Sequence, residues 1–205
     1  MTEEFHQPRS PSGDGVVLTH GAGGNARAPF LVALGEAFAA RGLTVLRYDL
    51  PFRQASRTAP PRPAGAARDR EGLRQAVAAM RARAGSRVFL GGQSYGGRQT
   101  SMLAAGEAAL VDGLLLLSYP LHPPGRPSQL RTAHLPKLTV PTLFAHGSRD
   151  PFGSLEEIEA ARSLIAVPTS LVGIAGAGHD LFRVPRRAGA DVAAEIVSAF
   201  LGLVG

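Results

Sequence analysis

The chain has 205 residues, of which 44% are hydrophobic, so it is long enough for one domain with a sizeable buried core. It contains no cysteine, which excludes disulfides, thiolate metal sites and a cysteine nucleophile. The formal net charge is +6, and Lys137 is the only basic residue that is not an arginine.

The N-terminal residues 1–14 are polar and rich in Pro, Gly and Ser, and we interpret them as a flexible tail before a single domain over residues 15–205. This segment lacks the apolar stretch of a signal peptide. No part of the chain approaches the roughly 18 consecutive apolar residues of a membrane span. We therefore expect a soluble, cytoplasmic protein that does not bind membranes. The sequence carries no signal for a particular oligomeric state.

Short apolar runs alternate with helix-length amphipathic segments along the chain, which is typical of a parallel sheet flanked by helices. The pattern predicts strands over residues 16–19, 43–48, 87–90, 113–118, 141–145 and 169–172. It predicts helices over residues 28–41, 66–84, 95–105, 154–165 and 188–203. We therefore expect an α/β fold with three layers, a doubly wound and mainly parallel sheet of about six strands.

Two proline-rich segments interrupt this alternation. Residues 51–65 carry four prolines and no apolar period, so we expect an exposed loop. Residues 119–137 form a second loop that is too short for a cap domain, and it contains His122 and His134. This loop either crosses the top of a binding site or serves only as a rigid connection.

Arginines are concentrated between Arg47 and Arg87, where ten of the 22 basic residues and only three acids lie. Such a stretch can bind an anionic ligand or nucleic acid, or it can be a solvated loop and helix face. Few aromatic residues are interleaved with these arginines, so base stacking is not favoured. We do not expect nucleic-acid binding.

The segment Gly92-Gln93-Ser94-Tyr95-Gly96 matches the pattern G-x-S-x-G between a predicted strand and a predicted helix. A serine on such a sharp turn is exposed for nucleophilic attack, and the flanking glycines avoid clashes with neighbouring backbone. The alternative is a glycine-rich turn with an incidental serine. The strand-turn-helix context favours Ser94 as a catalytic nucleophile.

A serine nucleophile needs a general base and a carboxylate that orients the base. Asp150 and His179 follow Ser94 in the chain order that a nucleophile turn of this kind requires, and each comes after a predicted strand. His146 precedes Asp150 and so does not fit the order. In isolation, Asp150 could be a turn aspartate and His179 a loop histidine. Because the carboxyl ends of parallel strands share one edge of the sheet, we predict a Ser94-His179-Asp150 triad.

Acyl transfer also needs donors for the negative charge that develops on the carbonyl oxygen. We expect the backbone N–H of Tyr95, directly after the serine, and the N–H of Ala22, in the glycine-rich segment after the first predicted strand. His20 is expected to brace this segment. The predicted reaction needs no metal and no organic cofactor.

The same N-terminal region also fits a dinucleotide-binding unit. Residues 21–26 satisfy G-x-G-x-x-A, and Asp49 ends the next predicted strand, where a ribose-binding acid would lie. This alternative would make the protein a small NAD(P)-dependent reductase. It leaves Ser94, Asp150 and His179 without a role, and Lys137 has no tyrosine four residues before it.

The chain also resembles a known family over most of its length. The stretches that carry the resemblance are LTHGAGG (18–24), LRYDLPF (46–52), GGQSYGGR (91–98), YPLHPPGRP (119–127) and DPF (150–152). They resemble a branch of the α/β-hydrolases close to the dienelactone hydrolase-like group. That branch includes animal testis-expressed hydrolase-like proteins and a subunit of a chromatin-acetylating complex. Arginine and methionine are common around the serine in the branch, where this chain has Gln93 and Tyr95.

The resemblance implies a compact hydrolase core without a lid domain and a site built from Ser94, Asp150 and His179. Together with the residues, it predicts a serine hydrolase that cleaves a small-molecule ester, thioester or lactone. The alternative function is a non-catalytic interaction module that retains the hydrolase fold, because some members of the branch serve as scaffolds. The intact triad favours the enzyme.

Overall fold

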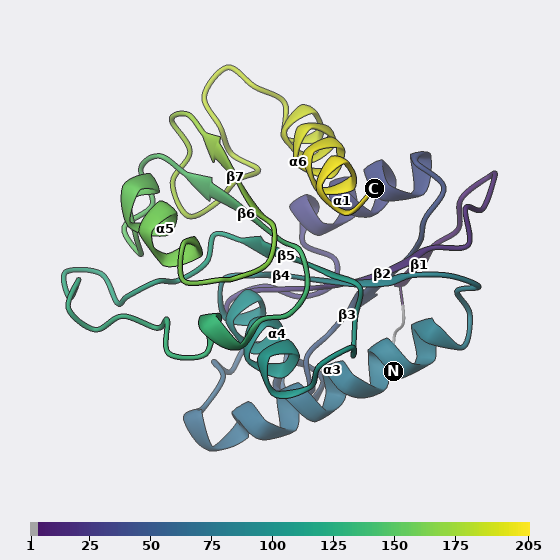
Figure 1. The fold of residues 1–205 in the computed structure, drawn as a ribbon, viewed down its shortest axis with the longest axis horizontal. Coiled ribbons are helices and arrows are strands. Elements are labelled where there is room, and N and C mark those ends of the chain that lie inside the picture. Colours follow the sequence, from purple (N-terminus) through teal and green to yellow (C-terminus); the bar gives the residue numbers. More distant parts are fainter. Residues whose placement is uncertain (1–3) are drawn as a thin grey trace.

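A computed structural model describes residues 4–205, whose seven strands form one sheet in the order β1-β3-β2-β4-β5-β6-β7 (Figure 1). All neighbouring strands are parallel except β1, which is antiparallel to β3. The strands are β1 (Glu4–His6), β2 (Gly15–Thr19), β3 (Thr44–Tyr48), β4 (Val88–Gln93), β5 (Gly113–Leu117), β6 (Thr142–Gly147) and β7 (Thr169–Ile174).

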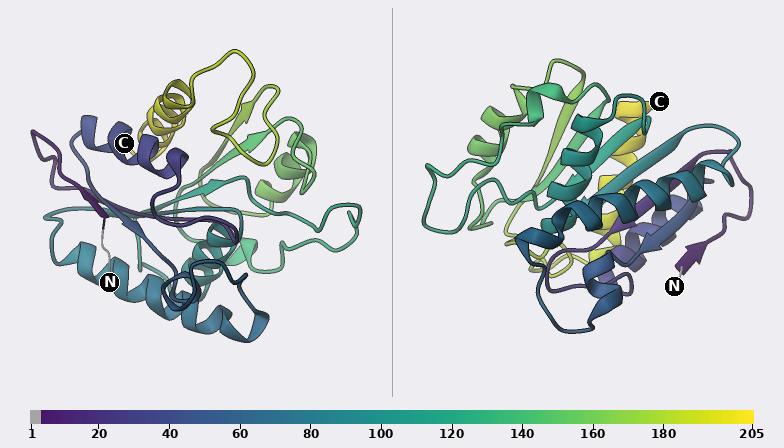
Figure 2. Two further views of the ribbon diagram at one scale, coloured as in Figure 1. Left: turned by 180° about the vertical axis from the view of Figure 1, so that it is seen from behind. Right: turned by 90° about the horizontal axis from the view of Figure 1, so that it is seen from below.

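Helices cover both faces of this sheet (Figures 1 and 2). The α-helices are α1 (Pro29–Ala40), α2 (Pro51–Ala55), α3 (Ala66–Arg81), α4 (Tyr95–Gly106), α5 (Leu155–Arg162) and α6 (Gly189–Val204). Two 3-10 helices, η1 (Pro63–Gly65) and η2 (Leu135–Lys137), lie in the loops. Helices α1 and α6 pack on one face, and α3, α4 and α5 pack on the other. The expected three-layer, doubly wound fold is therefore confirmed.

The period of two along each strand produces two separate cores. In β2, for example, Val16 and Leu18 face the core beneath α1 and α6, whereas Val17 faces the core beneath α3 and α4. All three side chains are fully buried. Strands that are buried on both faces read as continuous apolar runs, which explains why they are visible in the sequence.

The position of the site follows from the strand order. After β2 the chain crosses to β3 on one side, and it then returns past β2 to β4 on the other side. The loops after β2 and β4 therefore diverge at the carboxyl edge of the sheet, and ligands bind at such switch points in doubly wound folds. The loops after β6 and β7 reach the same edge, because these strands run parallel to β4 and β5.

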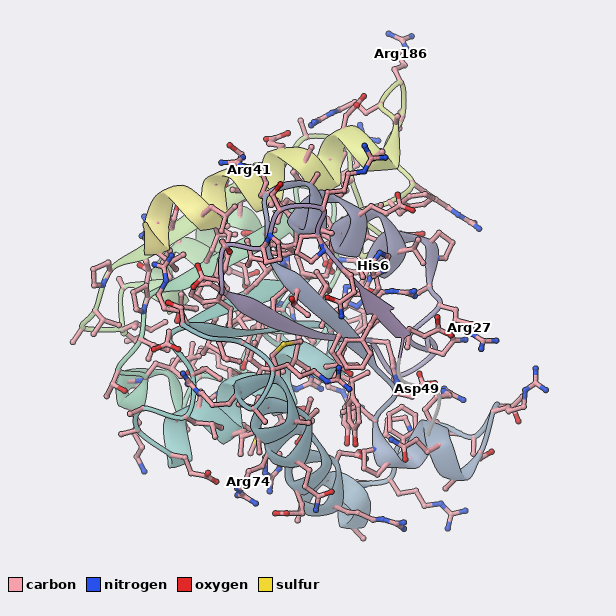
Figure 3. The ribbon with its side chains drawn as sticks, turned by 90° about the vertical axis from the view of Figure 1, so that its right-hand side faces the viewer. His6, Arg27, Arg41, Asp49, Arg74 and Arg186 are labelled. Atoms are coloured by element: carbon pink, nitrogen blue, oxygen red, sulfur yellow. The ribbon has the colours of Figure 1, made fainter. Side chains whose placement is uncertain are left out.

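We interpreted residues 1–14 as a flexible tail. Residues 1–3 lie outside the described part of the chain, and for residues 4–14 the interpretation is wrong. Residues 4–6 form β1 and pair with residues 45–47 of β3, which makes seven strands instead of six. Arg47 of β3 donates from Nε to His6 Nε2 at 2.7 Å. Figure 3 views the molecule from this edge of the sheet, where His6, Arg27 and Asp49 are labelled.

The prediction of an exposed loop over residues 51–65 is wrong in part. It contains α2 and η1, and Arg53 in α2 is only 6% exposed. Proline is compatible with the first turn of a helix, so Pro51 and Pro63 can begin these short helices. Residues 57–60 between them are exposed, as expected.

Within residues 4–205, no helix combines the length and the apolar character needed to cross a membrane.

The pairing of β1 predicts that the N-terminus contributes to stability. Removing residues 1–7 should lower the free energy of unfolding by about 1–3 kcal/mol, because the β1–β3 pairing and the contacts of Arg47 with this strand are lost. Urea denaturation measures this change. Glu4→Gln serves as the control, because it keeps the strand pairing and removes only the charge of Glu4 that faces Arg27 and Arg47. An unchanged unfolding midpoint for the truncated chain would restore the flexible-tail interpretation.

Candidate active site

Ser94 lies on a strained turn between β4 and α4. Its backbone has φ 50° and ψ −115°, a conformation that non-glycine residues rarely adopt. The turn is tight: a Cβ on Gly92 would lie 2.5 Å from the carbonyl carbon of Gly96, and a Cβ on Gly96 would lie 2.5 Å from the oxygen of His20. The Ser94 N–H donates to Leu117 O of the neighbouring strand at 2.8 Å, which holds the turn in place.

His179 joins Ser94 to Asp150. Its Nε2 lies 2.8 Å from Ser94 Oγ, and its Nδ1 lies 2.8 Å from Asp150 Oδ2. The three residues follow β4, β6 and β7, so strands far apart in the sequence deliver them to one edge of the sheet. The Asp150 side chain is fully buried, whereas the His179 side chain is 29% exposed. This arrangement can move a proton from a serine hydroxyl to an imidazole and stabilise the resulting imidazolium.

The loops that carry Asp150 and His179 hold each other. Arg149 N–H donates to Ala177 O at 2.8 Å, and the Asp150 N–H donates to Gly147 O at 3.1 Å. The second carboxylate oxygen of Asp150 accepts the Phe152 N–H at 2.9 Å. The carboxylate is thus fixed from both sides, which leaves Oδ2 directed at the histidine.

A second histidine, His146, lies behind this carboxylate at the end of β6. Its Nε2 is 3.6 Å from Asp150 Oδ2 and donates to Gly153 O at 2.9 Å. Burial lowers the pKa of His146, although the nearby Asp150 carboxylate acts in the opposite direction. The ring is therefore neutral at pH 7 and anchors the turn at Gly153.

The glycine-rich loop after β2 lies beside the serine. A Cβ on Gly21 would be 3.3 Å from the Cβ of Ser94. His20, which is fully buried, determines the direction of one peptide in this loop. Its Nε2 accepts the Leu50 N–H at 3.1 Å, so in the neutral ring Nδ1 carries the proton and donates to Gly21 O at 2.8 Å. Because C=O and N–H point in opposite directions across a trans peptide, this bond turns the Ala22 N–H away from His20.

Arg53 holds the same loop from the other side. Its Nη2 donates to Ala22 O at 2.7 Å and its Nε donates to Gly24 O at 2.8 Å. Asp49 accepts the Ala26 N–H at 2.6 Å, and Arg47 Nη1 donates to Ala26 O. Sequence reasoning did not assign Arg53 to the site, because its partners lie about thirty residues away in the chain. Arg53 lies in a proline-rich segment without a regular spacing of apolar residues, so the sequence did not indicate that its side chain is buried.

Tyr95 begins α4, and the first N–H groups of a helix have no partner within the helix. Its hydroxyl donates to Asp69 Oδ2 at 2.7 Å, and Asp69 Oδ1 accepts the Phe52 N–H at 3.0 Å. Burial and this hydrogen bond raise the pKa of Tyr95, so the hydroxyl keeps its proton. The side chain therefore ties the start of α4 to α2 and α3, and it leaves the backbone N–H of Tyr95 at the serine turn.

A pocket of about 470 Å³ opens beside the serine and the histidine. The glycine-rich loop forms one wall, and the apolar lining includes Phe30, Phe152 and Phe182. The Phe152 ring lies 4.3 Å from the His179 ring, between centroids. Asp180 and Arg183 also line the pocket, and Arg183 Nε lies 3.6 Å from Asp180 Oδ2. The pocket therefore offers a mainly apolar space for a small group next to Ser94 Oγ.

The proline-rich loop over residues 119–137 does not line this pocket within the described residues. His122 Nδ1 lies 2.9 Å from Pro123 O, and its Nε2 lies 3.3 Å from Glu157 Oε2; both contacts raise its pKa. His134 Nε2 lies 2.8 Å from Ser101 Oγ of α4. Both histidines therefore attach the loop to neighbouring helices.

Most of the arginines between Arg47 and Arg87 have partners inside the fold. Arg74, Arg81 and Arg87 form ion pairs with carboxylates, and Arg70 donates to Gln99. Arg57, Arg62 and Arg68 have no ion pair or side-chain hydrogen bond among residues 4–205. This distribution favours the solvated-face interpretation of the stretch.

The dinucleotide interpretation of residues 21–49 does not fit the contacts. The Asp49 carboxylate is occupied by the Ala26 N–H and lies 3.4 Å from His20 Nε2, so it holds the loop instead of facing a ribose. Within residues 4–205, the histidine, aspartate and glutamate side chains form no group of three or more that could hold a metal ion.

Known proteins share this fold. Residues 13–203 match a family described as an alpha/beta hydrolase domain. Dienelactone hydrolase from Anabaena variabilis is 21% identical over 98% of this chain and 90% of its own, with a TM-score of 0.74. A lidless α/β serine hydrolase from Xanthomonas campestris is 18% identical over 96% and 86% of the two chains, with a TM-score of 0.72.

A third structure, the ferulic-acid complex of Est1E from Butyrivibrio proteoclasticus, is 16% identical over 98% of this chain and 95% of its own, with a TM-score of 0.73. At these identities the structures share the fold. The resemblance found in the sequence is confirmed, and so is the core without a lid.

Proposed function

We propose that this chain, which belongs to the alpha/beta hydrolase family and is an enzyme of the hydrolase type, cleaves a small carboxylic ester, thioester or lactone through an acyl-enzyme on Ser94. The observation that carries the proposal is the pair of 2.8 Å contacts that link Ser94 Oγ, the His179 ring and Asp150 Oδ2. Hydrogen-bond reach between nucleophile and base, and between base and carboxylate, is what this chemistry requires.

In the first half of the reaction, Ser94 Oγ attacks the substrate carbonyl and its proton passes to His179 Nε2. Asp150 holds the ring so that Nδ1 keeps its proton and Nε2 is free to accept one, and its charge stabilises the imidazolium. His179 then donates the proton to the leaving group, and the acyl group remains on Ser94. In the second half, His179 takes a proton from water, which attacks the acyl-enzyme and releases the carboxylic acid.

The negative charge of the tetrahedral intermediate needs two donors near Ser94. We assign this role to the N–H groups of Tyr95 and Ala22. The first begins α4, where the helix dipole also favours negative charge. The second belongs to the peptide that the His20–Gly21 hydrogen bond turns away from His20. His20 and Arg53 are then positioning residues, because they contact the loop and not the reacting atoms.

The pocket supports a small molecule as the acyl substrate. A volume of about 470 Å³ lies near the lower end of ligand pockets, and its phenylalanine walls suit an apolar group. The interaction-module alternative has no comparable support, because the geometry of the three site residues is intact.

Labelling with a fluorophosphonate tests the activated serine. The wild-type chain should add one probe molecule, and Ser94→Ala should add none because the nucleophile is absent. His179→Ala should label at least about 10³-fold more slowly, because the hydroxyl loses its base. Intact-mass spectrometry measures the labelling. Ser128→Ala, at an exposed loop serine, is the matched control and should label like the wild type. Labelling that survives in Ser94→Ala would refute the proposal.

The assignment of Ala22 predicts a role for His20 in rate and not in binding. His20→Ala should lower kcat by about 10–100-fold with little change in KM, because one oxyanion donor loses its orientation. His20→Asn can place an amide donor where Nδ1 stood and should recover part of kcat. Steady-state kinetics on a 4-nitrophenyl ester measures both. Equal kcat in the wild type and His20→Ala would exclude this positioning role.

A further inference from the structure

Helix α4 and the proline-rich loop meet beside the serine turn. Ser101 Oγ–H donates to Arg98 O at 3.0 Å and therefore accepts from His134 Nε2–H at 2.8 Å. Arg98 lies three residues before Ser101, on the same face of the helix and one turn nearer to Ser94. Arg131 lies three residues before His134. The contact between Ser101 and His134 thus places the loop that carries Arg131 beside the helix that carries Arg98.

Arg98 is unusual among the arginines of this chain. Its N–H donates to Ser94 O at 2.9 Å, so its backbone belongs to the first turn after the nucleophile. The side chain is half-buried, and its Nε is buried without any hydrogen-bond partner. A buried donor on a charged group that stays unpaired is costly in free energy, and each such group in a native structure calls for an explanation.

Arg131 is fixed in place by the loop. Its backbone N–H donates to Leu121 O at 2.8 Å, its Nη1 donates to Pro120 O at 3.0 Å, and its carbonyl accepts the Tyr119 hydroxyl at 2.7 Å. Burial, and then the charge of Arg98, lower the pKa of Arg131. The three hydrogen bonds therefore hold Arg131 against the loop.

Within residues 4–205, neither Arg98 nor Arg131 forms an ion pair with a carboxylate. Burial lowers the pKa of His134 to about 4, so this ring is neutral at pH 7 and adds no charge. The pair of Arg98 and Arg131 is therefore cationic and partly desolvated, and Arg131 is held in place by hydrogen bonds, which suits the binding of a carboxylate or phosphate group.

We propose that Arg98 and Arg131 form a subsite for an anionic oxygen group, a carboxylate or a phosphate, on the substrate of the Ser94 site. This inference rests on the proposed function and narrows its substrate class to acyl compounds with a charged end. The apolar pocket lies on the α1 side of the sheet and does not include either arginine. The substrate then spans Ser94, with its apolar part against Phe30 and Phe182 and its anionic end against α4.

The neighbouring loop connects the two parts of the site. The His122 N–H donates to Phe152 O at 3.1 Å, and Phe152 stacks on His179 and lines the pocket. Residues 120–121, which hold Arg131, come directly before His122. The proline-rich loop therefore gains a function as the support for Arg131.

Binding is tested without catalysis, in the Ser94→Ala variant. Glutarate and inorganic phosphate are titrated separately, with glutaramide as the uncharged control, and protein NMR shifts give Kd. We expect saturable binding of at least one anion, and the tighter of the two identifies the anionic group. In the Ser94→Ala background, Arg98→Met and Arg131→Met should each weaken it about tenfold or more, because one charge-assisted contact is lost. Arg62→Met, at an exposed arginine, should leave Kd unchanged.

The unfolding temperature distinguishes a ligand site from a structural role. Arg98→Met should not lower the unfolding temperature, because the Nε of Arg98 has no partner to lose. If Arg98 had only a structural role, its replacement would lower the unfolding temperature. Failure of both anions to bind, or binding that neither substitution weakens, would overturn the subsite.

Hydrolysis then separates the subsite from the proposed function. Wild type should cleave 4-nitrophenyl hydrogen glutarate with a kcat/KM about tenfold or more above that of its methyl ester, and Arg98→Met should remove this preference. Equal rates on the two esters, lost together in Ser94→Ala, would support the hydrolase and contradict the subsite. Arginine-dependent glutarate binding without any ester hydrolysis would support the subsite and contradict the proposed function.

Discussion

The His179 ring makes the two contacts on which the rest of the site depends. One ring nitrogen lies 2.8 Å from the serine oxygen and the other lies 2.8 Å from the buried carboxylate of Asp150. To satisfy both at once, three loops from β4, β6 and β7 must be placed to within a fraction of an ångström. The parallel strands bring the loops to one edge, and the bond from Arg149 to Ala177 joins the last two. The strained turn at Ser94 is held in this frame by its hydrogen bond to the Leu117 carbonyl and by the close packing at Gly92 and Gly96.

Buried polar side chains hold the glycine-rich loop after β2 in one conformation. Glycine loses more conformational freedom on folding than any other residue, so such a loop needs external contacts. His20, Arg53, Arg47 and Asp49 supply them through backbone carbonyl and N–H groups. Two of the chain's arginines, Arg47 and Arg53, therefore serve to hold this loop. Arg98 and Arg131 differ from this group, because no carboxylate among residues 4–205 forms an ion pair with them.

Much of the fold could be predicted from the sequence, since strands buried on both faces produce continuous apolar runs and helices produce an amphipathic period. The sequence also predicted that Ser94, Asp150 and His179 lie together, because chain order and strand ends left few candidates. Other features gave no local signal. Strand β1 has three residues and depends on pairing with β3 about forty residues later. Helix α2 begins at a proline, and the partners of Arg53 lie in a loop after another strand. Such long-range hydrogen bonds have no periodicity, so only the structure reveals them.

Rapid-quench mass spectrometry can detect the proposed covalent acyl-enzyme on Ser94. The enzyme is mixed with 4-nitrophenyl acetate, quenched in acid within milliseconds and digested, and the acetylated residue is located by fragmentation. We expect a burst of 4-nitrophenol close to one per enzyme molecule and acetylation at Ser94 alone, with the modification lost as turnover ends. Ester turnover without acetylated Ser94, or with the acetyl group on another side chain such as Tyr95, would rule out Ser94 as the nucleophile.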